Sequence, residues 1–196
     1  LPAPGAEGHA VREALQAALL DFDRAAADAA RARLIVYSFD GALREVYMPM
    51  MEAIGDLWEA GEISIAQEHF ACSFVREQLI TMLHGISSGP VGGPLAICAG
   101  IEDERHELGL LAVAIRLGLR GHRVMYLGAD MPVGEVAALA QEHEPLVVCQ
   151  SLVRGTDVAK AVANARALRR QLPQDTLLAI GGRVAKDLAA RTEAGL

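Results

Sequence analysis

The chain has 196 residues, 52% of them hydrophobic and 4% aromatic, which allows one large domain or two small ones with a sizeable core. Its formal net charge is −7. With no dense cluster of lysine or arginine, this charge argues against nucleic-acid binding by the chain itself. The longest apolar runs are too short to span a bilayer, so we expect no membrane association.

Three cysteines, Cys72, Cys98 and Cys149, lie far apart in apolar surroundings. An odd number of separated cysteines without a CxxC pair predicts reduced, buried thiols in a cytoplasmic protein, and neither a disulfide framework nor a zinc site. The first eight residues, LPAPGAEG, have neither a starting methionine nor the apolar core of a signal peptide. We therefore expect the natural protein to continue upstream.

Residues 9–86 predict four helices, because alanine-rich stretches carry apolar residues at every third or fourth position. The helices are expected at 9–20, 21–38, 40–61 and 64–86. Asp21 and Asp40 are the expected N-caps of the second and third helices, and Gly61 is the expected end of the third.

Pro49 should kink the third helix, while Ser64 and Gln67 form an S-x-x-Q capping box at the start of the fourth. Helices of this number and length predict a four-helix bundle over residues 1–86. The glycines, prolines and serines of SSGPVGGP, residues 87–94, predict a linker between two domains.

Short apolar runs bounded by glycine or proline follow this linker and alternate with helical patterns. The strands are expected within 94–100, 122–130, 145–153 and 176–182, and the helices within 106–120, 133–143 and 157–171. This alternation, with strands apolar on both faces, predicts a flavodoxin-like, Rossmann-type doubly wound parallel sheet over residues 95–196. For residues 183–196 two alternatives stay open: a short helix closes the fold, or a final strand is missing.

The stretch IEDERHELGL, residues 101–110, lies directly after the first strand, where ligands bind in such a sheet. A phosphate loop is not expected, since G-x-G-x-x-G is absent and acidic residues repel phosphate. Glu104 can accept the proton of one imidazole nitrogen of His106 and leave the other to bind a metal. Gly109 would let a bulky group approach the backbone. From these residues alone, a solvated helix start with an unused histidine is an equally good interpretation.

The pattern E-x-H-x-x-G, formed by Glu104, His106 and Gly109, resembles the D/E-x-H-x-x-G signature of cobalamin-binding domains. The resemblance implies that the histidine replaces the cofactor's dimethylbenzimidazole as the lower ligand of cobalt, and that the displaced nucleotide tail enters the sheet. Two further signatures of that family, S-x-L or S-x-V after the third strand and G-G after the fourth, occur in the same order. The cofactor-binding residues implied are Ser151, Leu152, Val153, Gly181 and Gly182, with Arg105 beside the ligand.

A second motif lies in the helical part, where Trp58 is followed after nine residues by Glu68 and His69. The turn at Gly61 should bring these side chains into one region. From the residues alone, a core tryptophan beside an exposed Glu-His pair is the common alternative. The spacing resembles the W-x9-E-H motif of CarH/LitR-type photoreceptor regulators. It implies that Trp58 packs on the adenosyl group of 5′-deoxyadenosylcobalamin, and that Glu68 and His69 bind that group by hydrogen bonds.

The resemblance covers nearly the whole chain and implies a non-enzymatic, cytoplasmic light sensor that controls transcription. In that family the dark adenosylcobalamin form is a homotetramer on operator DNA, bound through an upstream MerR-type domain that is absent from this sequence. Light breaks the cobalt–carbon bond, and the tetramer falls apart. Glu59 stands where some light-sensing relatives have a histidine that binds cobalt after photolysis, so water or another ligand such as His69 is expected there.

Three other interpretations compete with light sensing. A corrinoid carrier of methyl groups between methyltransferases shares the α/β domain and a helical cap, but predicts a flat, apolar cap in place of Trp58, Glu68 and His69. A mutase subunit would need a substrate barrel, for which the chain has no room. The third is a cofactor-free, flavodoxin-like interaction domain, which a spectrum of the protein with added cobalamin would distinguish from the others.

Overall fold

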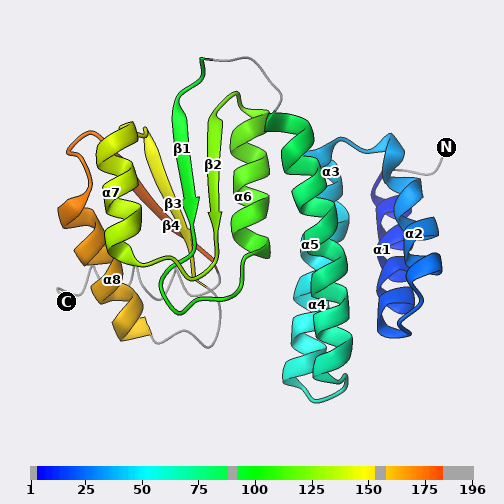
Figure 1. Ribbon diagram of the computed structural model, residues 1–196. Helices are drawn as coiled ribbons and strands as arrows, with labels where there is room; N and C mark the ends of the chain where they lie inside the picture. Colours follow the sequence, from blue (N-terminus) through cyan, green and yellow to red (C-terminus); the bar gives the residue numbers. More distant parts are fainter. Residues whose placement is uncertain (1–3, 88–91, 153–157, 183–196) are drawn as a thin grey trace. The chain divides into compact units, whose positions relative to one another are not determined.

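The structure is a computed structural model that describes residues 4–87, 92–152 and 158–182 (Figure 1). The chain divides into two compact units, Leu1–Met82 and Leu83–Leu196. The first unit is built from helices, and the second from a parallel sheet with its flanking helices. Residues 88–91, in the middle of the predicted linker, lie outside the described residues.

The first unit contains the four predicted helices. In chain order its elements are α1 (Pro4–Leu20), α2 (Arg24–Ala32), the 3-10 helix η1 (Arg33–Val36), α3 (Phe39–Ala42), the π-helix η2 (Leu43–Tyr47), α4 (Met48–Glu59) and α5 (Ile65–Ser87). The elements α3, η2 and α4 follow one another without a break and form the third helix. The second helix is shorter than predicted, because its last residues, including the β-branched and exposed Ile35 and Val36, adopt the tighter 3-10 geometry.

Two of the predicted N-caps are wrong by two residues. The cap of α2 is Asp23, not Asp21, and its carboxylate accepts the backbone N–H three residues further on at 2.9 Å. The cap of α3 is Ser38, not Asp40, and its hydroxyl accepts a backbone N–H at 3.1 Å. Each helix start offers two residues that can cap, so residue type alone does not identify the one with non-helical backbone geometry.

The other predicted helix signals are present. Gln67 Oε1 accepts the N–H of Ser64 at 2.9 Å, and Ser64 Oγ accepts the N–H of Gln67 at 3.3 Å, which completes the capping box of α5. Gly61 follows the end of α4 with a φ of 74°, which glycine adopts without strain. Pro49 lies inside the continuous third helix, directly after the wider π-turn, and the kink expected there stays a prediction.

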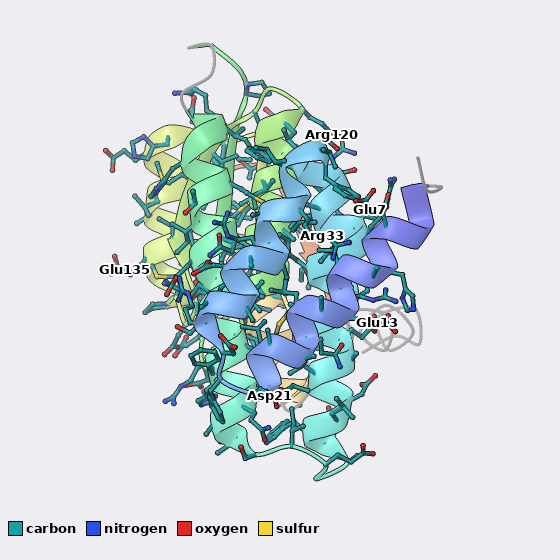
Figure 2. All side chains as sticks on the ribbon, turned by 90° about the vertical axis from the view of Figure 1, so that its right-hand side faces the viewer. Glu7, Glu13, Asp21, Arg33, Arg120 and Glu135 are labelled. Atoms are coloured by element: carbon teal, nitrogen blue, oxygen red, sulfur yellow. The ribbon has the colours of Figure 1, made fainter. Side chains whose placement is uncertain are left out.

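An aliphatic core holds the helical unit together. Helix α1 packs against α2 and against η2, and Figure 2 looks onto α1 and α2, with Asp21 at the turn that joins them. The largest fully buried side chains of this unit are Leu15, Leu19, Leu43, Tyr47, Met50, Ile54, Phe74 and Leu79. Burial raises the pKa of Tyr47 to about 12, so its hydroxyl stays protonated at neutral pH.

The second unit is a doubly wound parallel sheet, as predicted. Its elements are β1 (Leu95–Ala99), α6 (Leu108–Leu119), β2 (Arg123–Gly128), α7 (Val133–His143), β3 (Val147–Ser151), α8 (Val158–Gln171) and β4 (Leu177–Gly181). All strand pairs are parallel, in the order β2-β1-β3-β4. This order reverses direction between β1 and β3, which is the point where doubly wound sheets bind ligands. Both alternatives for residues 183–196 lie outside the described residues.

The two faces of the sheet are covered by different helices, with α6 on one side and α7 and α8 on the other (Figure 1). Ile97, Ala99 and Val148 pack in the core beneath α7 and α8. Because side chains alternate along a strand, Cys98 and its register partner Cys149 face α6 instead. The central strands β1 and β3 are thus buried on both faces, and the carboxyl edge of the sheet is left for the loops that carry the candidate site.

Candidate functional site

The loop that carries His106 leaves β1 at the carboxyl edge of the sheet (Figure 1). Gly100 starts this loop, and its N–H donates to the carbonyl of Gly128, at the end of β2, at 2.7 Å. A side chain on Gly100 would lie 2.7 Å from Cα of Ala129, so glycine is what allows the loops after β1 and β2 to approach this closely. The loop ends at Glu107, the N-cap of α6.

Glu104 and His106 form a pair in which the carboxylate is buried and the imidazole is exposed. Glu104 is 2% exposed, whereas the side chain of His106 is 59% exposed. Glu104 Oε1 accepts the backbone N–H of His106 at 2.8 Å and lies 2.6 Å from Nδ1 of its ring. These contacts orient the ring and favour the tautomer with its proton on Nδ1. Nε2, the nitrogen farther from the carboxylate, is then the one suited to a metal.

Residues from two other elements contact the same loop. Asp130, in the segment after β2, accepts the N–H of Asp103 at Oδ1 over 2.7 Å, and its own N–H donates to the carbonyl of Glu104 at 3.0 Å. Lys160, in α8, forms an ion pair with the carboxylate of Asp103. The loop is therefore tied to the segment after β2 and to α8.

The start of α6 is tied to the sheet by a tyrosine. The hydroxyl of Tyr126 in β2 donates to Glu107 Oε2 at 2.5 Å. Arg105, a cofactor-binding candidate from the sequence, is exposed on the loop between Glu104 and His106. The candidate metal ligand thus lies on a loop whose far end is fixed by a side-chain contact to β2.

Ser151, the first residue of the S-x-L or S-x-V signature, lies beside Gly109, the glycine of the E-x-H-x-x-G signature. A side chain on Gly109 would lie 3.4 Å from Oγ of Ser151, so the first turn of α6 passes close to the end of β3. Ser151 pairs in register with Gly181 at the end of β4. The structure therefore brings Gly109, Ser151 and Gly181 together at one edge of the sheet.

The G-G signature, Gly181 and Gly182, contacts Leu152 of the S-x-L or S-x-V signature through backbone atoms. The N–H of Leu152 donates to the carbonyl of Gly181 at 2.8 Å. Gly182 has a φ of 110°, and a Cβ there would lie 1.9 Å from the carbonyl oxygen of Leu152. No L side chain fits that position without a shift of the backbone. Val153, the last residue of the second signature, lies outside the described residues.

The candidates in the helical unit lie around the turn between α4 and α5. Trp58 is in the last turn of α4 and is 45% exposed, and Glu68 and His69 are in the first turn of α5. Glu68 Oε2 lies 2.8 Å from His69 Nδ1, and Glu68 Oε1 accepts the thiol of Cys72 at 2.9 Å. Cys72, predicted to be buried, is only partly buried, and this partial burial together with the hydrogen bond raises the pKa of its thiol far above the usual range. The thiol therefore stays protonated and acts as a donor.

The site fits a metal that arrives with most of its own ligands. In the described ranges of the chain, no group of three or more His, Cys, Asp or Glu side chains could hold a bare metal ion. A cobalt ion already held by a corrin ring needs only one nitrogen from the protein. The exposed ring of His106, oriented by the buried Glu104, meets that requirement.

Comparison with known families identifies the group to which this site belongs. The B12 binding domain family matches residues 94–195, more than half of the chain, and a second family with the same description matches residues 11–80. The chain belongs to the B12-binding domain family. Membership implies cobalamin as the cofactor of this B12-binding protein.

Two regulators of Myxococcus xanthus are similar to this B12-binding protein. The HTH-type transcriptional repressor CarH is 31% identical over 152 residues, which cover 78% of this chain and 50% of CarH. The HTH-type transcriptional repressor CarA is 36% identical over 92 residues, which cover 47% of this chain and 32% of CarA. The chain spans half or less of the length of these relatives. The resemblance to CarH-type regulators found in the sequence is confirmed.

The monomethylamine corrinoid protein of Methanosarcina barkeri has a similar solved structure, with a TM-score of 0.74 and 18% identity over 89% of this B12-binding protein and 85% of the other chain. At this identity the likeness shows the fold alone.

Along the described part of the chain, no helix has the length and apolar character required to cross a membrane.

The sequence did not indicate the residues that support the candidate ligands. Asp130 stands directly beyond the carboxyl end of the second predicted strand, which was a usable signal. Cys72 is one helical turn after Glu68, so helical spacing alone placed it within reach of that carboxylate. Asp103 and Lys160 are 57 positions apart, and no local pattern links residues at that separation.

Proposed function

We propose that this chain is the light-sensing part of a transcription regulator and that it binds 5′-deoxyadenosylcobalamin with His106 as the lower ligand of cobalt. The observation that carries the proposal is the buried carboxylate of Glu104, 2.6 Å from His106 Nδ1, at the carboxyl edge of the sheet. Similarity to a transcriptional repressor over 78% of this chain supports the regulatory role.

The residues proposed to hold the nucleotide tail of the cofactor lie at the ends of β3 and β4 and in the first turn of α6. Gly109 leaves room beside Ser151, whose hydroxyl can donate or accept a hydrogen bond. The further residues proposed to contact the cofactor are Arg105, Leu152, Val153, Gly181 and Gly182. The close pairing of Leu152 with Gly181 supports their assignment to one pocket.

We assign the adenosyl group to Trp58, Glu68 and His69. The exposed face of Trp58 offers a flat apolar surface for the adenine. Glu68 accepts from Cys72 and lies beside His69, and a carboxylate with its several lone pairs can also accept from ribose hydroxyls. With Glu59 in place of a histidine, water or His69 is the proposed upper ligand after photolysis.

When bound, adenosylcobalamin supplies a cobalt–carbon bond that green light breaks. The chain's own part is to supply His106, oriented by Glu104, as the lower ligand of cobalt, and to hold the adenosyl group against Trp58. Trp58 would lose its contact with the adenosyl group after photolysis, and we propose that this change dissociates a homotetramer. In this proposal the protein is not an enzyme, works in the cytoplasm, and reaches DNA through an upstream domain.

The alternative proposal is a corrinoid protein that carries methyl groups in a methyltransferase system. It is favoured by the fold shared with the monomethylamine corrinoid protein. A methyl group would make no use of the polar contacts that Glu68 and His69 offer. The two proposals therefore differ in the upper group that the protein prefers.

The test is to load the protein in the dark with adenosylcobalamin or methylcobalamin and to measure both affinities and the visible spectra. Stacking on Trp58 contributes roughly 0.5–1.5 kcal/mol, and a hydrogen bond to a charged group roughly 1.5–3 kcal/mol. Adenosylcobalamin should therefore bind about tenfold or more tightly. Equal affinities would favour the methyl carrier.

His106→Ala tests the lower ligand in the same assay. Its bound cofactor should show the spectrum of cobalt without an imidazole ligand. His143→Ala is the matched control, because His143 is the last residue of α7 and is exposed; this variant should keep the parent spectrum. If His106→Ala also kept the parent spectrum, His106 would not be the ligand.

A further inference from the structure

Two aspartates beside the candidate ligand have unusual backbone geometry. Asp103 has a φ of 69° and Asp130 a φ of 53°, both in the left-handed region. Residues other than glycine seldom adopt it, and asparagine and aspartate tolerate it best. The two residues are 27 positions apart in the sequence, yet they are hydrogen-bonded to each other. Such local strain persists only where surrounding contacts maintain it.

Asp130 contacts two consecutive residues of the His106 loop. Its carboxylate oxygen Oδ1 accepts the N–H of Asp103 at 2.7 Å, and its backbone N–H donates to the carbonyl of Glu104 at 3.0 Å. One residue thus supplies both an acceptor and a donor to adjacent positions of the loop. This fixes where the backbone of Glu104 lies.

The position of Glu104 in turn decides where the imidazole lies. Its carboxylate is buried and makes two contacts with His106, one to the backbone N–H and one to the ring. Lys160 adds a contact from α8 by pairing with the carboxylate of Asp103. The contacts form a continuous series from Asp130, through Glu104, to the ring.

We infer that Asp130 is a positioning residue for His106, which holds the loop in its ligand-binding form before any cofactor arrives. The inference rests on the proposed function, in which His106 binds cobalt. A loop that had to be ordered on binding would lose affinity, because the ordering is unfavourable. Asp130 acts through Glu104 and has no contact with the reacting atoms.

Two substitutions separate the side chain of Asp130 from its backbone geometry. Asp130→Asn keeps an oxygen acceptor and a residue that tolerates positive φ. Asp130→Gly removes the acceptor but adopts positive φ freely, so the fold is retained. Asp175→Gly is the control for the general effect of this exchange, since Asp175 lies in the turn before β4, at the opposite edge of the sheet.

The first measurement needs no cofactor. Amide hydrogen exchange at Asp103 and His106 should become about tenfold or more faster in Asp130→Gly, because each amide depends on the loop geometry that Asp130 fixes. Asp130→Asn and Asp175→Gly should exchange like the parent. Unchanged exchange in Asp130→Gly would overturn the inference, whatever the cofactor does.

The second measurement uses the cobalt(II) form of bound cobalamin, whose electron paramagnetic resonance spectrum is split by a nitrogen ligand. The parent and Asp130→Asn should show this splitting. Asp130→Gly should show a smaller split fraction and bind about tenfold or more weakly, as expected for loss of a hydrogen bond to a charged acceptor. Parent-like splitting and affinity in Asp130→Gly would refute a positioning role.

The two measurements also separate this inference from the proposed function. If the parent itself shows no nitrogen splitting, the proposed lower ligand is wrong, and with it the role of Asp130 in metal binding. The exchange data would then decide whether Asp130 still holds the loop. If the parent shows splitting and Asp130→Gly matches the parent in splitting, affinity and amide exchange, the proposed function stands and the inference fails.

Discussion

Two glycines of the candidate site have different physical roles, although both belong to cobalamin signatures. Gly182 has positive φ, and a Cβ there would overlap the carbonyl oxygen of Leu152 at 1.9 Å. Gly109 lies in the first turn of α6, and its Cβ would lie 3.4 Å from Ser151 Oγ, at the edge of ordinary contact. The protein without cofactor therefore requires glycine at 182, whereas it can accommodate alanine at 109.

Gly182→Ala should lower the free energy of unfolding of the α/β unit by about 2–4 kcal/mol, because the backbone must shift to relieve both strain and overlap. Gly109→Ala should leave that free energy equal or raise it by up to about 1 kcal/mol, since alanine is the better helix former. The same substitution should weaken cobalamin binding about tenfold or more, because it fills the proposed tail pocket beside Ser151. Thermal unfolding followed by circular dichroism and titration with cobalamin measure the two quantities.

The two substitutions test different roles of the two glycines, cofactor binding for Gly109 and stability for Gly182. If Gly109→Ala bound cobalamin like the parent, Gly109 would have no part in the pocket. If Gly182→Ala unfolded at the parent temperature, the close approach of β4 to Leu152 would not contribute to stability.

At the scale of the elements, helix starts show where sequence patterns identify a boundary and where they do not. The S-x-x-Q box of α5 was predicted correctly, because two residues at fixed spacing must agree. The N-cap of α2 was predicted at Asp21, but the structure has it at Asp23. A single aspartate has no second residue at fixed spacing that could confirm it as the cap. The π-helix η2 was not predicted, since one additional residue in a turn leaves the apolar pattern nearly unchanged.

Asp23→Ala should reduce the stability of the helical unit by about 0.5–2 kcal/mol, because it removes the acceptor for a backbone N–H at the start of α2. Asp21→Ala is the matched control, since it removes an exposed aspartate two residues away and should change stability by less than about 0.5 kcal/mol. Urea unfolding followed by the fluorescence of Trp58, the only tryptophan, reports on this unit. A larger loss for Asp21→Ala would show that the cap is assigned to the wrong residue.

The strands and the site followed from the sequence to different degrees. Apolar runs bounded by glycine or proline located all four described strands, because short apolar segments between turn residues leave a strong local signal. The same alternation placed His106, Ser151 and Gly181 at one edge of the sheet. The contacts of Asp130 and Lys160 did not follow, because they join elements that are distant in sequence and depend on left-handed backbone angles.

At the scale of the whole molecule, the proposed signal is a change of assembly. In the proposed holoprotein, Trp58 contacts the adenosyl group while His106 binds cobalt. When light breaks the cobalt–carbon bond, Trp58 would lose the group that it contacts in this proposal. Packed interiors do not tolerate large voids, so the residues around Trp58 should rearrange. Light needs only to remove the group that favoured one of two arrangements.

Size-exclusion chromatography with light scattering tests this on the adenosylcobalamin-loaded chain, kept dark and then exposed to green light. We expect a larger dark species, and a smaller one after illumination. Protein loaded with hydroxocobalamin should elute as the smaller species in the dark, since it never carries the adenosyl group. An unchanged mass, with the spectrum proving photolysis, would mean that this chain alone does not signal through assembly.

The π-helix η2, within the third long helix, determines how α4 is rotated about the helix axis relative to α3. Each residue of an α-helix turns the chain by about 100°, and the segment Leu43–Tyr47 holds its turn open with one residue more than α-geometry would use. If this segment closed to α-geometry without losing a residue, α4 and Trp58 would rotate by up to about that angle relative to α3, whereas loss of one residue there would leave their orientation nearly unchanged. A change between π- and α-geometry in this segment is thus a route by which Trp58 could be re-aimed without replacing any residue proposed to touch the cofactor.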